Sequence, residues 1–294
     1  MATVYTEQTK NVRRTWFLMT VFLVIIIALG YFISYYYQDI SILYIAIVFS
    51  LFMNIFSYWY SDKIALSLSR AVPAERSQYP DLYNVVENLS ITAGLPMPRV
   101  YIINDQAPNA FATGRNKEHS AVAVTTGLLD ILSRSELEGV IAHELSHIGN
   151  RDILLSTVVV VLVGFISILA DIFIRGGLGR GRSDDNNKGG GIIMIIGIIL
   201  IILSPIIAKL IQLAISRKRE FLADASAILL TRYPEGLAGA LRKIEQTNIP
   251  MQKTYTATAH LFISDPKANF SKKVYNLFST HPLTEDRIKA IMGR

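Results

Sequence analysis

Two long apolar runs open the chain with almost no break between them. The first extends from Trp16 to Tyr37, contains no charged residue, and is as long as the roughly 20 residues that cross a hydrocarbon core. The second extends from about Ile40 to Tyr60 and follows a Gln38-Asp39 turn, which predicts a tight antiparallel pair of membrane helices. The first run is too long for a secretory signal core and lacks a small-residue cleavage site, so it predicts an uncleaved anchor.

Basic and aromatic residues mark one side of this predicted hairpin. The basic residues are Lys10, Arg13, Arg14, Lys63 and Arg70. Trp16 and the Tyr58–Tyr60 stretch lie at the same side and are typical of an aromatic belt at a membrane interface. By the positive-inside rule this side is cytoplasmic. We therefore expect a multi-pass protein of the cell membrane whose polar segments face the cytoplasm.

Two further apolar runs occur later in the chain, from Ile153 to Ile174 and from Gly191 to Ile215. They contain Asp171 and Lys209, so they are weaker candidates for membrane helices. Helical periodicity cannot show which solvent surrounds an apolar helix. A second membrane hairpin is favoured, and helices partly buried against protein remain the alternative.

Polar composition returns between about Asp62 and Asp152 and again after Arg217. A helix is predicted over Leu82–Ala93, ended by Gly94. Short strands are predicted over Arg99–Asn104 and Ala121–Thr125, and further helices over Glu220–Leu230, Leu237–Gln246 and Thr284–Met292. A small sheet among helices is therefore expected in the polar part of the chain.

Composition narrows the chemistry that these segments can carry. Hydrophobic residues make up 51% of the 294 residues and charged residues 18%, with a mean hydropathy of +0.36, which agrees with a chain partly in lipid. The absence of cysteine excludes disulfides, thiolate ligands and a cysteine nucleophile, so a metal site must use nitrogen and oxygen. The net charge of +6 lies mainly beside the apolar runs, which favours the lipid bilayer and not nucleic acid as its partner.

The segment SELEGVIAHELSHIGN, residues 135–150, has the pattern of a helix that holds a metal. Ser135 followed by Glu138 matches a capping box and predicts the helix start. His143 and His147 lie four residues apart, on one face of that helix, where both imidazoles can reach one ion. Glu144 is placed to act as a general base on water. The alternative is a helix whose histidines and glutamate are only solvated.

A catalytic zinc site needs a third protein ligand. Glu220 directly follows the fourth apolar run, whereas His147 directly precedes the third, so a hairpin between them would bring the two residues together. Asp224, four residues after Glu220, could hydrogen-bond the far nitrogen of a ligating histidine. The alternative for Glu220 is an ion pair with Arg217 or Arg219.

Several of these motifs together resemble the HtpX-like membrane metalloproteases, which are related to the CAAX prenyl proteases. They are NAFATG at 109–114, HELSH at 143–147, RKREFLADA at 217–225 and STHPLTEDRI at 279–288. The resemblance implies one Zn²⁺ per chain, held by His143, His147 and Glu220, with Glu144 as base. It also implies catalytic roles for Asn109, at a substrate-binding edge, and for His281, supported by Arg287. Without the resemblance, Asn109–Gly114 is predicted to be a turn.

The predicted fold is mainly α with a small β-sheet: a multi-pass membrane protein whose zincin (gluzincin-like) catalytic domain is assembled from two polar segments. Residues 1–61 form the first membrane hairpin and 153–215 the second, while 62–152 and 216–294 form the catalytic domain. The implied function is endopeptidase cleavage of misfolded or damaged membrane proteins or unfolded polypeptides. A prenyl-protein processing protease and a catalytically silent membrane scaffold are the alternatives.

Overall fold

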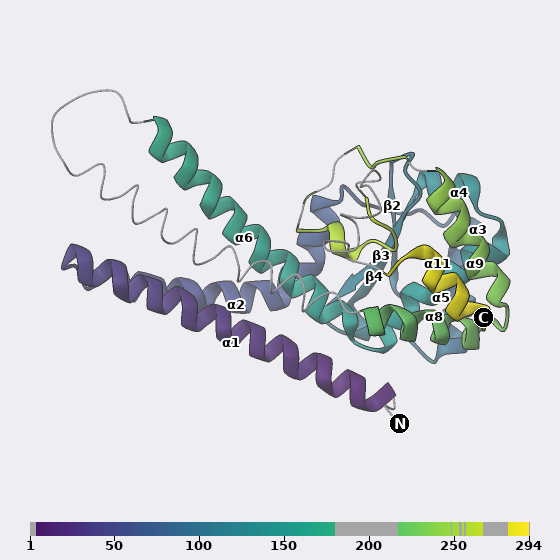
Figure 1. Cartoon of the computed structure of the whole chain (residues 1–294), viewed down its shortest axis with the longest axis horizontal. Coiled ribbons are helices and arrows are strands. Elements are labelled where there is room, and N and C mark those ends of the chain that lie inside the picture. The colour runs from purple at the N-terminus through teal and green to yellow at the C-terminus, as the bar shows by residue number, and fades with distance from the viewer. Residues whose placement is uncertain are drawn as a thin grey trace.

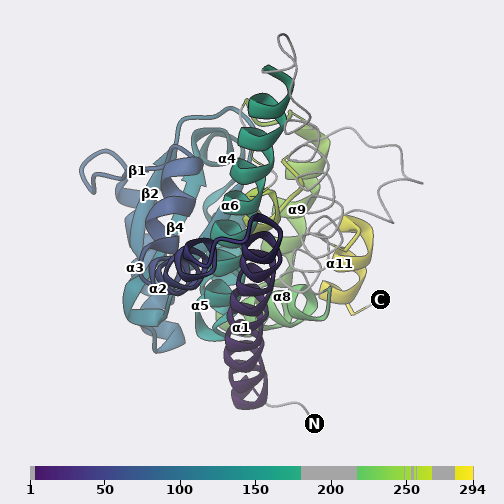
Figure 2. The same cartoon turned by 90° about the vertical axis from the view of Figure 1, so that its left-hand side faces the viewer.

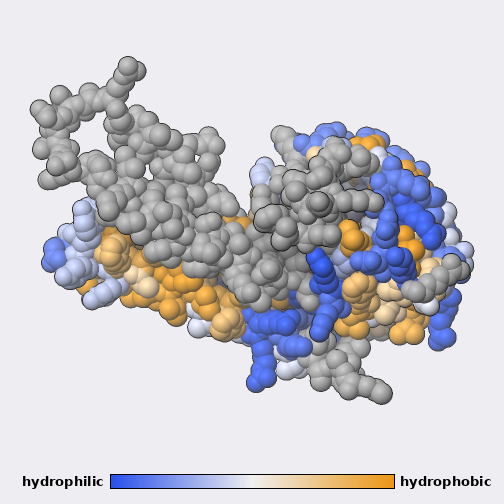
Figure 3. All heavy atoms as spheres, viewed as in Figure 1, coloured by the Kyte–Doolittle hydropathy of each residue, from blue (hydrophilic) through white to orange (hydrophobic). Residues whose placement is uncertain are grey.

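Long helices extend from a compact unit that contains a sheet (Figure 1). The structure, a computed structural model, describes residues 4–179, 217–247, 249–252, 255, 257–266 and 282–293. On the face shown in Figure 3, hydrophobic residues gather along the extended helices, and strongly hydrophilic residues lie on the compact unit and where it meets those helices. The predicted fold class, mainly α with a small sheet, is confirmed.

The first two helices form the predicted hairpin. Helix α1 covers Val4–Tyr37 and α2 covers Ser41–Leu68, and both are long and apolar enough to cross a membrane. The chain reverses at Gln38, which adopts a positive φ of 53°. The helices touch so closely at Gly30 that a Cβ there would lie 2.3 Å from the Cβ of Ala46. Backbone-level packing of this kind is typical of helix pairs in lipid.

Helix α6, Asp152–Gly179, contains the third apolar run and packs against both α1 and α2. Its buried side chains contact the first two helices in two clusters, through Leu154, Leu155, Val158, Val159, Val160, Val161, Leu162 and Val163. The start of this run is therefore buried against protein, whereas a full crossing by it remains a prediction. The fourth apolar run, and most of the segment RGGLGRGRSDDNNKGG at 175–190 that precedes it, lie outside the described residues.

The sheet has four strands in the order β1-β2-β4-β3. They are β1 Val72–Pro73, β2 Arg99–Ile103, β3 Ala110–Gly114 and β4 Ser120–Thr125. Strands β2 and β4 are parallel, and β3 is antiparallel to β4 and forms one edge. The turn predicted from the residues of 109–114 alone is wrong. All five β3 residues are buried, so the strand has none of the polar alternation that marks a half-exposed strand.

Helices pack around this sheet (Figure 2), and one of them is α5, Arg134–Gly149. The others in this unit are α3 Pro80–Ala93, α4 Thr126–Ile131, α8 Arg217–Thr231, α9 Pro234–Thr247 and α11 Thr284–Ile291. One hydrophobic core joins Leu82, Val122 and Ile141 from the first polar segment to Leu237 and Ile291 from the second. The two polar segments, which precede and follow α6 in the sequence, thus build one packed unit.

The first turn of α5 differs from the prediction. Ser133, not Ser135, is the N-cap, and Glu136, not Glu138, completes the capping box, with the Ser133 N–H donating to Glu136 Oε2 at 2.7 Å. Both serine–glutamate pairs match the motif, so local sequence cannot choose between them. A tertiary contact favours the pair Ser133–Glu136, because Lys243 of α9 donates to Glu136 Oε2 at 2.7 Å and to Ile131 O at 3.1 Å.

Replacing Glu136 with alanine is expected to lower the free energy of unfolding by about 1 kcal/mol, the typical effect of losing a helix cap. Burial raises the pKa of Glu136, but hydrogen bonds from Lys243 and Ser133 outweigh it and lower that pKa. Its contribution is therefore present above the ordinary pKa of glutamate and is lost as the pH falls through the lowered value. Thermal unfolding of Glu136→Ala at neutral and acid pH measures both effects.

Glu138→Ala is the matched control for this experiment. Glu138 lies on the same helix, and within the described residues its side chain forms only an exposed ion pair with Arg134, at 3.4 Å. Such a pair contributes at most about 0.5 kcal/mol to stability. Equal destabilisation by the two substitutions would contradict the assignment of Glu136 as the capping residue.

Candidate active site

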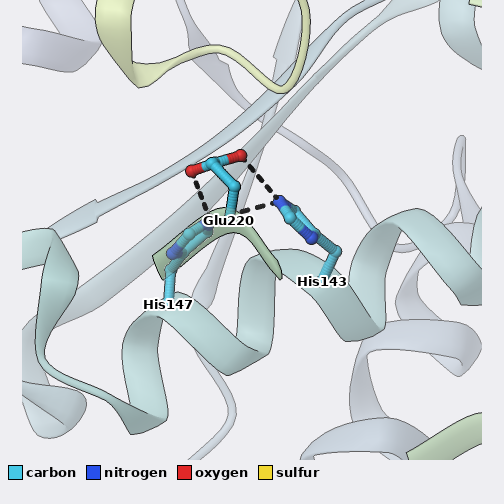
Figure 4. Close-up of side chains that lie close together, drawn as sticks. All are labelled: His143, His147 and Glu220. Atoms are coloured by element: carbon cyan, nitrogen blue, oxygen red, sulfur yellow. Dashed lines mark hydrogen bonds and ion pairs between the residues drawn. The ribbon is translucent and has the colours of Figure 1, made fainter. Parts of the chain in front are cut away.

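The last two turns of α5 present two imidazoles to the same point. His143 and His147 lie one helical turn apart, and their Nε2 atoms are 3.1 Å from each other (Figure 4). Apolar residues of the helix, including Val140, Ile141 and Leu145, are fully buried in the core and hold its orientation. The helix packs against β3, α8 and α9. The predicted pairing of the two histidines on one face is therefore realised on a rigidly packed helix.

Helix α8 brings Glu220 over the two imidazoles (Figure 4). Its Oε2 lies 3.7 Å from His143 Nε2, and its Oε1 lies 3.6 Å from His147 Nε2. The three donor atoms all fall within 4.8 Å of one another. Two ligands of a tetrahedral zinc ion at about 2.1 Å lie roughly 3.4 Å apart, so this spacing fits such an ion. The nitrogen and oxygen donors are also those that zinc accepts.

The outer nitrogen of each imidazole faces a carboxylate. His143 Nδ1 is 2.9 Å from Asp224 Oδ1, and His147 Nδ1 is 3.0 Å from Asp152 Oδ2. These contacts place a proton on Nδ1 of each ring, which leaves Nε2 as the nitrogen that can offer a lone pair to an ion. Two lone pairs and a carboxylate that face one another repel unless a cation lies between them. This donor arrangement is the second reason that the site fits a metal ion.

Asp152 was not identified as a site residue by the sequence analysis. It begins α6, which leaves α5 at an angle of 82° after Arg151, a residue with a positive φ of 57°. The bend turns the Asp152 carboxylate back toward His147. Its position five residues after His147 is the only sequence signal available, and that spacing has no meaning until the bend is known.

Arg287 of α11 fixes Asp224. Its Nε donates to Asp224 Oδ2 at 2.9 Å and its Nη2 to Asp224 Oδ1 at 2.6 Å, a two-point contact that sets the plane of the carboxylate. Nη1 donates to Ile263 O at 3.2 Å and lies 3.9 Å from Glu220 Oε2. Burial raises the pKa of Asp224, but the charge of Arg287 and the hydrogen bond to His143 hold it well below its usual range. Asp224 is therefore a carboxylate at neutral pH.

Glu144 is buried between α5 and the edge strand. Only 1% of its surface is exposed, and the Ala112 N–H of β3 donates to its carboxylate. Burial raises the pKa of Glu144 to about 7, against the opposing charge of His147. A carboxyl group with this pKa can both accept and return a proton near neutral pH.

The electrostatics of the two histidines differ. Burial lowers the pKa of His143, and the hydrogen bond to Asp224 only partly offsets that effect. Burial also acts to lower the pKa of His147, but the Asp152 hydrogen bond and the charge of Glu220 outweigh it and raise that pKa to about 9. The carboxylates around His147 thus favour positive charge at this point.

Two further residues were assigned to the site by resemblance. The Asn109 side chain donates to Ser264 O at 3.1 Å and accepts from Ser264 N at 3.3 Å, so both ends of its amide contact the same residue of the chain. In this structure Asn109 ties the 262–264 segment to the start of β3, and its contact with a substrate remains a prediction. His281 lies outside the described residues.

A paired-histidine helix, a glutamate from a second helix and a buried carboxyl group beside them are the arrangement of a metalloprotease site, here carried on membrane helices. The model of peptidase family M48 matches residues 76–294. The chain belongs to this family, and within it to the HtpX-like group, as the sequence resemblance predicted.

Relatives cover almost the whole chain. A protease HtpX homolog of Caldanaerobacter subterraneus subsp. tengcongensis is 47% identical over 295 residues, which span 98% of this chain and 97% of that protein. A protease HtpX homolog of Thermococcus kodakarensis is 49% identical over 266 residues, spanning 88% of this chain and 89% of that protein.

The fold also resembles a solved structure, Ste24p of S. mikatae, with a TM-score of 0.52 at 19% sequence identity. The match covers 93% of this chain but only 62% of Ste24p. This likeness shows a shared fold.

Proposed function

We propose that the protein is a zinc-dependent endopeptidase anchored in the membrane, with one zinc ion held by His143, His147 and Glu220. The observation that carries this proposal is the convergence of two imidazole nitrogens and a carboxylate beside the buried Glu144. A silent scaffold has no need of a buried carboxyl group with a raised pKa, so this feature favours the enzyme.

The residues divide the chemistry of peptide hydrolysis among them. A bound zinc ion supplies a Lewis acid that polarises a peptide carbonyl and lowers the pKa of water. Glu144 takes the proton from the attacking water and later returns it to the leaving amine. Asp224 and Asp152 hold the two imidazoles in one tautomer, and Arg287 holds Asp224.

The edge strand β3 suggests how a substrate binds. Within the described part of the chain β3 pairs with β4 alone, and the Ala112 N–H on its other side reaches Glu144. The Ile263 N–H already donates to Ala110 O at 2.9 Å, so the start of this edge is covered. At the other end of β3 the Gly114 N–H donates to Thr157 Oγ1 of α6 at 3.4 Å, so a peptide would pair with this edge around Ala112, beside the base. Such binding requires an extended chain, which supports unfolded polypeptides as substrates.

Membrane proteins that are misfolded or damaged are the substrates that the position of the site favours. The metal-binding helix α5 passes directly into α6, which packs against the membrane hairpin. Unfolded segments of a neighbouring membrane protein therefore reach the site without leaving the membrane surface. Quality control of membrane proteins is the corresponding biological role.

Metal analysis and cleavage assays test the enzyme proposal together. Detergent-purified protein is expected to contain one zinc ion per chain and to cleave an unfolded substrate such as casein. A chelator should stop cleavage, and added Zn²⁺ should restore it. Cleavage that continues after complete removal of the metal would refute the proposal.

The orientation of the site is a separate proposal: the compact unit faces the cytoplasm. The chain contains no cysteine, so single cysteines at Arg70, Gln38 and Arg242 can be labelled with an impermeant reagent on intact cells. All three native side chains are exposed. Only the cysteine at Gln38, in the turn between α1 and α2, is expected to react from outside. External labelling at Arg70 or Arg242 would reverse the orientation.

A further inference from the structure

The first turns of α1 carry polar residues on the side that faces the metal-binding helix. Gln8, Asn11 and Thr15 recur at helical spacing just before the apolar run begins. Asn11 is fully buried and Thr15 is 1% exposed. Gln8 Nε2 donates to Gly149 O at 2.6 Å, at the end of α5. The anchor helix therefore meets the catalytic unit through polar contacts and not through apolar packing alone.

Asn11 is the centre of these contacts. Its Nδ2 donates to Asp152 Oδ1 at 2.6 Å and to Asn150 O at 3.2 Å, one residue on each side of the bend between α5 and α6. Its Oδ1 accepts from Arg219 Nη1 at 3.4 Å, and Arg219 also lies 3.8 Å from Asp152 Oδ1. An amide side chain has two N–H donors and one acceptor, and Asn11 uses both kinds at this junction.

Asp152 connects Asn11 to His147, a ligand of the proposed metal ion. Asp152 is 4% exposed, and its two oxygens divide between two partners: Oδ1 faces Asn11 and Oδ2 faces His147 Nδ1. Hydrogen bonds at one oxygen fix the plane of the carboxylate and so the direction of the other. The orientation of the His147 ring therefore depends on a residue 136 positions earlier in the chain, on a membrane helix.

Arg219 adds a link to the third proposed ligand. It precedes Glu220 on α8, is buried, and contacts the same two side chains of this junction. The segments that supply His147 and Glu220 thus meet at Asn11, although Asn11 lies 139 residues from Asn150 and 208 from Arg219 in sequence. A polar group from the anchor joins both halves of the site.

We propose that Asn11 is a positioning residue of the metal site: it acts through Asp152 on His147, so the membrane anchor helps to build the zinc site. This inference rests on the proposed zinc-dependent function. It assigns α1 a role beyond attachment to the bilayer.

Zinc affinity of the full-length protein in detergent tests this inference, measured by competition with a chelator. Asn11→Leu keeps the branching of the side chain but removes its donors and its acceptor, and Asn11→Asp keeps the shape but turns an oxygen toward Asp152. Each is expected to weaken zinc binding ~10 to 100-fold, the usual effect of losing a group that orients a ligand. Thermal unfolding of the metal-free variants shows whether the fold is retained.

Asn54→Leu is the matched control. Asn54 is a buried asparagine of the other anchor helix, and its Nδ2 donates to Ser50 O within the same helix, at 3.1 Å. Its replacement removes a buried amide from the hairpin without touching Asp152 or His147. It is expected to leave the zinc affinity of the parent unchanged.

A double-mutant cycle separates positioning from general packing. Asp152→Asn alone should weaken zinc binding, and Asn11→Leu should have little further effect in that background, because the path through Asp152 is already broken. Equal weakening by Asn11→Leu in both backgrounds would overturn the proposal, as would parental affinity in either folded Asn11 variant.

Two other outcomes are also decisive. If both Asn11 variants fail to fold while Asn54→Leu folds, Asn11 holds the fold and not the ligand, and the inference is wrong. If the parent itself binds no zinc, the proposed function fails first, and that result is distinct from a parent that binds zinc while its Asn11 variants bind equally well.

Discussion

Replacing Glu144 with glutamine is expected to reduce peptide cleavage by ~10² to 10⁴-fold, the usual contribution of a general base, while zinc stays bound. The amide keeps the shape of the side chain but cannot take a proton from water. Glu144 is not among the three proposed donors, so the ion should remain. Measurements on the same preparation should therefore show an unchanged zinc content and a reduced rate of casein cleavage.

Glu138→Gln is the control for the same helix, because in the part of the chain that the structure describes Glu138 makes only the exposed contact with Arg134. It should cleave at the parental rate. Equal rates for Glu144→Gln and the parent would contradict the assigned base. Loss of zinc from Glu144→Gln would mean that this residue helps to assemble the site, which the structure does not indicate.

Replacing Glu220 with alanine is expected to remove most of the zinc and all detectable cleavage. The site would retain two imidazole donors, one fewer than a catalytic zinc site needs. Asp224→Asn should have a smaller effect, weakening zinc binding ~10 to 100-fold, because it alters a partner of His143 and not a donor. Zinc titration of the purified variants distinguishes the two.

Asparagine is the informative replacement at Asp224. Both replacements remove the carboxylate charge beside the Arg287 guanidinium, which is 2% exposed, and breaking a buried ion pair destabilises a fold by about 3–5 kcal/mol. The asparagine amide oxygen can still accept from Arg287, whereas alanine would remove both contacts that Asp224 makes with the guanidinium. If Glu220→Ala keeps stoichiometric zinc at parental affinity, the third donor lies elsewhere, and His281 becomes the next residue to replace.

Both experiments concern donors and partners that come from distant parts of the chain. The imidazoles lie on α5, before the third apolar run, and the carboxylate of Glu220 lies on α8, after the fourth. Arg287 arrives from α11 and Asn11 from α1. A substitution in any of these four helices can therefore change zinc affinity without touching the ion.

Features set by local periodicity were predictable from the sequence. Four-residue spacing places His143 and His147 on one face of any α-helix, whatever surrounds it. Uncharged runs of about 20 residues predict membrane helices in the same way, because bilayer thickness fixes the length required. Strands β2 and β4 and helices α3, α8, α9 and α11 also fall where composition and end signals predict them.

Features set by packing between distant segments were not predictable in this way. The choice of Ser133 over Ser135 as the cap depends on Lys243, and the contact of Asp152 with His147 depends on the bend at Arg151. The edge strand β3 carries no alternating pattern because all its residues are buried. A sequence lists the groups that can pair, but their distances are fixed only when the core brings segments more than 100 residues apart into contact, as it does at Asn11. The chemistry of the site is thus visible in its residues, whereas the support that orients them is decided by the tertiary structure.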